Sequence, residues 1–151
     1  NRYVIFMIYI DMTFFNICFF KLFNITIMKK VREFHEKMEL AINQPYSKEL
    51  MDFRLRLLFE EIQELASAAL DIETDLHTEE RHVMMQDLLK EMCDVVYVIK
   101  GMAVSFGMDF DKAFALVHKS NMSKLPLIKD ANGKVQKGLN YEPPILEGLI
   151  N

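Results

Sequence analysis

The sequence contains no tryptophan, few glycines and few cysteines, and each shortage narrows the class of protein. Glycine occurs five times and proline four times in 151 residues, while leucine, methionine, glutamate and lysine are abundant, so the composition favours helices. The two cysteines, Cys18 and Cys93, are far apart and form no CxxC motif, which argues against a disulfide framework and a zinc cluster. This cysteine usage is typical of a reducing compartment, and we expect a cytoplasmic protein.

An excess of positive charge is also missing. The chain carries 18 basic and 22 acidic residues, a net charge of −4, which argues against a nucleic-acid partner bound through a basic surface. The four histidines show no HxxxH spacing, so we do not expect zinc. The length fits one domain with a hydrophobic core.

The first 28 residues differ from the rest of the chain. From Tyr3 to Met28, 20 of 26 residues are apolar, which is enough for a membrane span, but Asp11 and Lys21 interrupt the run. We favour the interpretation that residues 1–27 are an apolar leader upstream of a start at Met28, and that residues 28–151 form the functional domain. The alternative is a membrane-tethered protein, which requires residues 3–27 to be a genuine part of it.

After Met28 the apolar spacing predicts an all-α fold, an antiparallel bundle of about four helices. Turn signals at Asn132-Gly133 and Pro143-Pro144 predict an extended or looped C-terminal tail from Ser123 onward. Broad apolar sectors on the two long helices predict that oligomerisation completes the core, as a dimer or a tetramer. The expected helices are residues 29–42, with Val31, Phe34, Met38 and Ile42 inward; 47–73, capped by Ser47; 79–106, capped by Thr78 and ended by Gly107; and about 110–121, capped by Asp109.

Acidic residues lie within the hydrophobic stripes of the two long helices. Glu61 and Glu64 form one pair and Glu91 and Asp94 another, and residues three apart direct their side chains the same way. A carboxylate among apolar side chains costs several kcal/mol unless it is paired, protonated or bound to a metal. Asp94 falls at the edge of its stripe. The other three continue apolar rows, which are Leu50, Phe53, Leu57 and Ala68 on one helix and Met84, Leu88, Val95, Val98 and Met102 on the other.

Antiparallel packing of the two helices gathers these four carboxylates around one small volume. Mg²⁺ takes oxygen ligands and leaves room for water and substrate phosphates, so the pattern indicates metal-assisted hydrolysis of a phosphate ester or anhydride. A second interpretation is buried ion pairing, with Arg54, Arg56 or Lys100 as partners. Glu60, on the border of its stripe, is either a further ligand or a solvated neighbour.

The acidic spacing also resembles a known family. Glu60-Glu61-x-x-Glu64, 26 residues, then Glu91-x-x-Asp94 is similar to the EExxE…ExxD signature of the all-α nucleoside triphosphate pyrophosphohydrolases, in particular the MazG-like and phosphoribosyl-ATP pyrophosphohydrolase-like members. The resemblance covers nearly everything from residue 31 to the C-terminus. Further segments that carry it are VREFHEKM (31–38), RLRLLFEEIQEL (54–65), EMCDVVYVIKGMAVSFGMDFDKAF (91–114), VHKSNMSKL (117–125) and GKVQKGLNYEPP (133–144).

The resemblance implies hydrolysis of a nucleoside triphosphate, or a related nucleotide such as phosphoribosyl-ATP, between the α and β phosphates. Glu61, Glu64, Glu91 and Asp94 would then be catalytic residues and ligands of Mg²⁺, with Mn²⁺ as a substitute, and one of them would orient the attacking water. Which of them acts as the base stays open, and so does the identity of the nucleotide. A catalytically silent helical dimerisation module on the same scaffold is the alternative function.

Substrate contacts are expected from the C-terminal part of the chain. Asn121 and Lys124 match the SNMSK segment, where an amide and an ammonium suit sugar or phosphate contacts. Lys134 and Lys137 either close over the triphosphate or belong to a solvated loop. Tyr97, one turn after Asp94, either stacks on a base or is a surface tyrosine.

Overall fold

The computed structural model describes residues 27–74, 78–126 and 128–150. In these ranges the chain is helical with isolated bridges and no strand of a sheet, which confirms the all-α prediction. No helix among them is both long and apolar enough to cross a bilayer. The predicted leader lies outside the described residues except for its last one. The helices are residues 27–37, α2 (Lys48–Thr74), α3 (Thr78–Phe106) and α4 (Phe110–Met122).

The chain divides into two compact units, which we describe one at a time. The helical-pair unit contains Phe34–Met108 and Ile150, and the tail unit contains residues 27–33 and Asp109–Leu149. The boundary at residue 108 follows the end of α3, where Gly107 adopts φ 65° and Met108 N donates to Ala103 O at 2.9 Å. A left-handed glycine directly after a helix is a common helix end, and Gly107 was predicted for this role.

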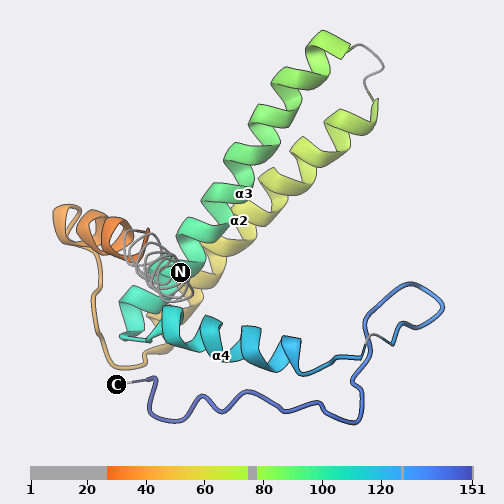
Figure 1. The fold of residues 1–151 in the computed structure, drawn as a ribbon. Coiled ribbons are helices and arrows are strands. Elements are labelled where there is room, and N and C mark those ends of the chain that lie inside the picture. The colour runs from red at the N-terminus through yellow and green to blue at the C-terminus, as the bar shows by residue number, and fades with distance from the viewer. Residues whose placement is uncertain (1–26, 75–77, 127, 151) are drawn as a thin grey trace, which may run out of the picture. The chain divides into compact units, whose positions relative to one another are not determined.

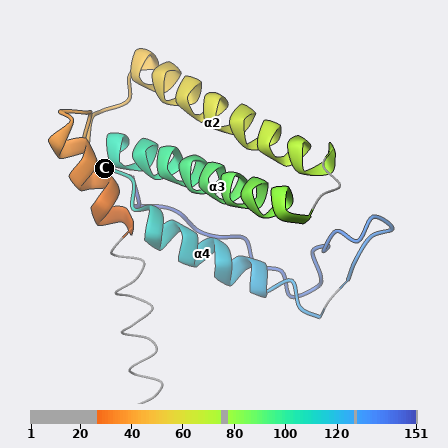
Figure 2. The ribbon, with the colours of Figure 1, turned by 90° about the horizontal axis from the view of Figure 1, so that it is seen from above.

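The helical-pair unit consists mainly of α2 and α3, which lie side by side and antiparallel (Figures 1 and 2). Ser47 caps α2 as predicted, because its Oγ accepts a hydrogen bond from Leu50 N at 3.1 Å. Thr78, the predicted cap of α3, is the first residue of that helix, and its side chain is outside the part that the structure describes. The predicted bounds of both helices are otherwise met within one residue. The pairing therefore brings the middle of α2 against the middle of α3, where the acidic residues are.

The first helix ends five residues earlier than its apolar spacing predicts. The helix ends at residue 37, Glu39 adopts φ 54°, and Leu40 N donates to His35 O at 2.8 Å. This is a left-handed helix end with a non-glycine residue, so no glycine in the sequence marked it. Met38, predicted to face inward, is 56% exposed, so that part of the prediction was wrong.

The segment after this helix is held by backbone hydrogen bonds to the last turn of α3. Asn43 N donates to Val104 O at 3.0 Å and Gln44 N donates to Ser105 O at 2.7 Å. The last carbonyls of a helix have no partner within the helix, so they are available to such a segment. These two hydrogen bonds therefore hold the segment that follows the early helix end, and Asn43 adopts a left-handed φ of 49°.

Two buried polar side chains, those of His35 and Arg54, lie beside Gly101 of α3 in the helical-pair unit. His35 is 2% exposed and Arg54 is 4% exposed, and a Cβ on Gly101 would lie 3.1 Å from His35 Nε2 and 3.7 Å from Arg54 Nη1. His35 Nδ1 is 2.8 Å from Ala41 O, which fixes the ring. A side chain at position 101 would therefore crowd His35, and glycine allows the histidine and the arginine to pack directly on α3.

Besides residues 27–33, the tail unit consists of α4 and the segment that returns along it (Figures 1 and 2). Asp109 caps α4 as predicted, with its carboxylate accepting from Lys112 N at 3.1 Å. Asp109 N donates to Leu149 O at 2.9 Å, and Glu142 N donates to Ser123 Oγ at 2.8 Å, so the returning chain is fixed at both ends of the helix. These contacts give the C-terminal segment a defined path without regular secondary structure.

Candidate metal centre

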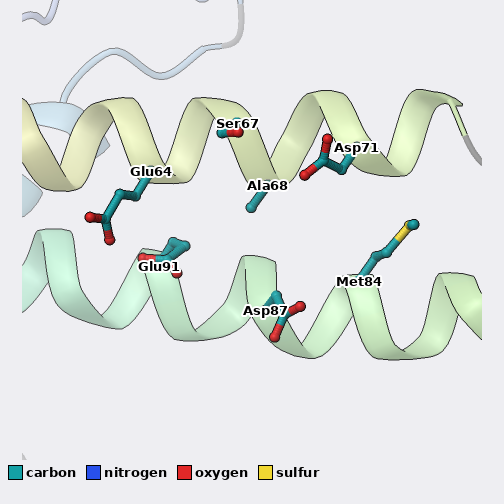
Figure 3. A pocket seen from close by; sticks show the side chains of 7 residues that line it. All are labelled: Glu64, Ser67, Ala68, Asp71, Met84, Asp87 and Glu91. Atoms are coloured by element: carbon teal, nitrogen blue, oxygen red, sulfur yellow. The ribbon is translucent and has the colours of Figure 1, made fainter.

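Three of the four predicted carboxylate ligands come together between α2 and α3. One carboxylate oxygen each of Glu61, Glu64 and Glu91 can be chosen so that all three lie within 4.8 Å of one another. Glu61 and Glu64 are one turn apart on α2, and Glu64 extends towards Glu91 on α3 (Figure 3). The antiparallel pairing therefore produces the juxtaposition that the sequence predicted for these three residues.

The burial of the three carboxylates is uneven. The side chain of Glu91 is 12% exposed, and its Oε2 is buried with no hydrogen-bond partner. Glu61 is half-buried, whereas Glu64 is exposed, which differs from the prediction that both continue a buried apolar row. A buried carboxylate oxygen with no donor is costly, so Glu91 is the member of the group that most requires a cation.

The electrostatics of the cluster show the mutual repulsion of its charges. The pKa of Glu61 is raised by burial first and then by the negative charges of Glu64, Asp94 and Glu91, while Lys90 opposes the shift. Like charges within a few ångströms disfavour the ionised form of each other. Burial and the neighbouring negative charges thus both make Glu61 harder to ionise.

Asp94 is not a member of this three-residue group and instead binds Lys90. Lys90 Nζ lies 3.0 Å from Asp94 Oδ2 and 2.8 Å from Glu91 Oε1. These two contacts raise the pKa of Lys90 above its usual range. The predicted basic partners were Arg54, Arg56 and Lys100. Lys90 was missed, although its spacing of four residues from Asp94 is a pattern from which such a pair can be predicted.

The donor set fits a small divalent cation. Oxygen ligands of one Mg²⁺ lie about 3 Å apart when adjacent and about 4.2 Å apart when opposite, so at least two of the three pairs would have to close to about 3 Å, a movement that rotation of the glutamate side chains supplies. All donors are carboxylate oxygens, the ligands that Mg²⁺ and Mn²⁺ favour, and the unpartnered Glu91 Oε2 supplies an open ligand position. Glu60, the further candidate ligand, is exposed and is not in the group.

An open pocket of about 500 Å³ continues from the cluster along the seam between α2 and α3. Glu64 and Glu91 stand at one end, with Ser67 and Ala68 on the α2 side (Figure 3). Asp87 lies opposite on the α3 side, and Asp71 and Met84 line the other end. The pocket gives water and a small ligand access to the carboxylates.

The predicted substrate contacts other than Tyr97 belong to the tail unit. Lys124 Nζ donates to Asn121 Oδ1 at 2.7 Å, so these two residues of the SNMSK segment form a polar pair. Lys137 Nζ lies 4.5 Å from the centre of the Tyr141 ring, and Lys134 N donates to the Asp130 carboxylate at 2.9 Å. The tail unit thus holds cationic and amide groups that contact one another or neighbouring side chains.

Tyr97 is in the helical-pair unit and contacts another aromatic ring. Its ring meets that of Phe34 edge to face, with centroids 5.7 Å apart, and the residue is 36% exposed. An edge-to-face contact covers at most one face of the tyrosine ring. The geometry is compatible with both roles that the sequence left open for it.

Comparison with known proteins assigns the chain to a family. A family model described as phosphoribosyl-ATP pyrophosphohydrolase matches residues 31–121, which include the acidic cluster, Lys90 and Asn121. No curated protein sequence matches the chain. The match covers more than half of the chain and agrees with the all-α fold and the paired helices. This chain therefore belongs to the phosphoribosyl-ATP pyrophosphohydrolase family.

Proposed function

We propose that this protein is a Mg²⁺-dependent nucleotide pyrophosphohydrolase. Its substrate would be a nucleoside triphosphate, or a related nucleotide such as phosphoribosyl-ATP, cleaved between the α and β phosphates to a monophosphate and pyrophosphate. The observation that carries the proposal is the convergence of Glu61, Glu64 and Glu91 from two helices beside an open pocket. Membership of the family supports the reaction class independently of this geometry.

The carboxylates would hold the cation and position the attacking water. A divalent cation bound here would neutralise phosphate charge and lower the pKa of a bound water. Glu61, Glu64 and Glu91 would bind it, and Asp94 would complete the set after Lys90 releases it. In the reaction, oxygen from water joins one phosphorus while the P–O bond to the bridging oxygen breaks, and a carboxylate of the cluster accepts the water proton.

Groups of the tail unit would contribute to substrate binding. We assign Asn121 and Lys124 to sugar or phosphate contacts, because they form a polar pair at the end of the matched part of the chain. Lys134 and Lys137 add positive charge on the same unit, and Tyr97 offers a ring for base stacking. A cationic group that contacts phosphate lowers the KM without performing chemistry.

We also propose a homo-oligomer. Large apolar side chains are exposed on both long helices, including Phe59 and Leu70 of α2, each 60% exposed, and Leu89 of α3, also 60% exposed. Such surface is costly in water, and pairing with a second copy would bury it in a larger helical bundle. Analytical ultracentrifugation tests this: a dimer or tetramer is expected, and Leu89→Lys should shift it towards the monomer. A wild-type monomer at all concentrations would contradict it.

The exposed free thiol of Cys93 favours a reducing compartment, and we therefore propose a cytoplasmic location. Cell fractionation of the natural protein tests this. Recovery in a secreted or membrane fraction would contradict it.

A panel of nucleotides incubated with Mg²⁺ tests the proposed reaction. Pyrophosphate release is expected from at least one of the canonical dNTPs, NTPs and phosphoribosyl-ATP, and Glu91→Gln should abolish it. Asp52→Asn is the matched control, because Asp52 is a carboxylate of α2 that pairs with Lys48 on the surface. Absence of product from every nucleotide, with Mg²⁺ and with Mn²⁺, would instead favour the silent dimerisation module.

A further inference from the structure

Lys90 contacts the acidic cluster in a way that differs from an ordinary surface ion pair. Its ammonium lies 2.8 Å from Glu91 Oε1 and 3.0 Å from Asp94 Oδ2. The lysine is 61% exposed, whereas the Glu91 side chain is 12% exposed. The exposed ammonium of Lys90 thus neutralises the Glu91 carboxylate, which is mostly removed from water.

Through these two contacts Lys90 neutralises the carboxylates that a metal ion would bind. Glu91 Oε1 is bound by Lys90, while Oε2 of the same carboxylate is buried without a partner. Asp94, the fourth residue of the acidic motif, has one oxygen on the same ammonium. A divalent cation that binds both Glu91 and Asp94 therefore competes with Lys90 for their negative charge.

On the basis of the proposed metal centre, we infer that Lys90 is a positioning residue that acts as a tethered substitute for the metal ion. In the metal-free protein its ammonium holds the Glu91 and Asp94 carboxylates together. On metal binding it exchanges places with the incoming cation. Its long flexible side chain and high exposure allow this exchange without movement of α3.

This role has two consequences of opposite sign for one substitution. Removal of the lysine charge also removes its repulsion of the incoming metal ion, so the metal should bind more tightly. Without the same charge, the carboxylates of the metal-free protein repel one another unopposed, so the metal-free protein should be less stable. A surface ion pair with no role would change neither quantity, and a lysine that only pre-organises the ligands would weaken metal binding when removed.

The test compares three variants of the full chain, by Mn²⁺ binding and by thermal unfolding in EDTA. Lys90→Met keeps the apolar stem and removes the charge, and Lys90→Arg keeps the charge. Lys48→Met is the matched control, because Lys48 forms a similar pair with Asp52 four residues away on α2. Mn²⁺ binding is read by isothermal titration calorimetry and by the loss of the free-ion electron paramagnetic resonance signal, neither of which depends on activity.

We expect Lys90→Met to bind Mn²⁺ with a Kd roughly 3- to 10-fold lower than wild type at low ionic strength. In EDTA its Tm should fall by a few degrees, while Lys90→Arg and Lys48→Met stay close to wild type. An unchanged or higher Kd for Lys90→Met, or a metal-free Tm that does not fall, would overturn the inference. If wild type itself binds no Mn²⁺, the proposed metal centre fails as well, so the two failures are distinguishable.

Discussion

One carboxylate oxygen of Glu64 on α2 lies within 4.8 Å of one carboxylate oxygen of Glu91 on α3. The two residues are separated by 26 residues that include the end of α2 and the first half of α3, so only the antiparallel pairing brings them together. Two negative charges at this separation repel each other unless a cation lies near them. The helix pair therefore maintains an arrangement that is unfavourable for folding alone, which is expected of a binding site.

Glu61→Gln should abolish activity while leaving the protein folded. The pKa of Glu61 is raised, so ionising this residue costs more in the folded state than in the unfolded state. Its stabilising contribution is present at low pH and is lost as the pH rises through the folded pKa. A neutral amide should therefore keep or raise the metal-free Tm at pH 7, by up to about 3 °C.

The loss of kcat for Glu61→Gln should be about 10²- to 10⁴-fold. Unfolding is followed by circular dichroism in EDTA, and activity by pyrophosphate release with Mg²⁺. A variant that unfolds at a much lower temperature would show that Glu61 belongs to a structural ion pair instead.

Gly101→Ala should destabilise the protein, although alanine is the better helix former. A Cβ at this position would lie 3.1 Å from His35 Nε2, and the ring is fixed by its contact with Ala41 O. We expect the free energy of unfolding to fall by about 1–3 kcal/mol, because overpacking outweighs the gain of about 1 kcal/mol in helix propensity. Urea denaturation measures this.

Gly138→Ala is the control for that experiment. The nearest atom to a Cβ there is Lys124 O at 3.5 Å, an ordinary contact. Equal effects of the two substitutions would show that His35 and Arg54 do not limit the space beside α3.

Stability should decrease below neutral pH because of His35. Burial lowers the pKa of this histidine, and the charge of Arg54 lowers it further, while the hydrogen bond to Ala41 opposes the shift. The unfolded chain therefore takes up a proton near pH 6.5 when the folded protein does not, and stability falls as the pH drops below that value. The slope from one such group is at most about 1.4 kcal/mol per pH unit.

Urea denaturation of wild type and His35→Gln between pH 5 and pH 8 isolates this contribution. The variant should be less stable at pH 8 and should show a shallower decrease towards pH 5. Parallel curves for the two proteins would indicate that other groups cause the acid sensitivity.

Lys124→Ala should raise the KM of the nucleotide about 10-fold and change kcat less. The loss of a charged hydrogen bond to phosphate removes binding in the ground state and in the transition state alike. Lys129→Ala is the matched control, since Lys129 is an exposed lysine of the same unit that the family resemblance does not select. Steady-state kinetics should separate the two variants, and equal KM values for them would contradict the assignment of Lys124.

The long helices could be predicted because their signals are local. Ser47 bonds the first turn of α2, Asp109 that of α4, and Gly107 ends α3, and each acts within a few residues of its own position. The early end of the first helix could not be predicted, because Glu39 takes up a left-handed conformation that glycine usually marks. The carbonyls that accept the hydrogen bonds of the following segment belong to α3, which is distant in the sequence.

The acidic cluster was predictable in outline but not in its charge balance. The apolar periodicity places Glu61, Glu64 and Glu91 on the facing sides of two helices, and antiparallel pairing of these helices brings their carboxylates together. Burial was harder to predict, since Glu64 is exposed at the edge of the seam while Glu91 is mostly covered. The partner of Glu91 and Asp94 is Lys90 rather than a basic residue more distant in the sequence, because this neighbouring lysine on the same helix reaches both carboxylates.

The most direct test of the central claim is ³¹P nuclear magnetic resonance of the reaction with the best substrate of the panel, with Mg²⁺ and then with excess EDTA. With Mg²⁺ we predict a nucleoside monophosphate, or its phosphoribosyl counterpart, and pyrophosphate in equal amounts, and with EDTA no reaction. Release of inorganic phosphate with a diphosphate product, or turnover that persists in EDTA, would contradict the claim.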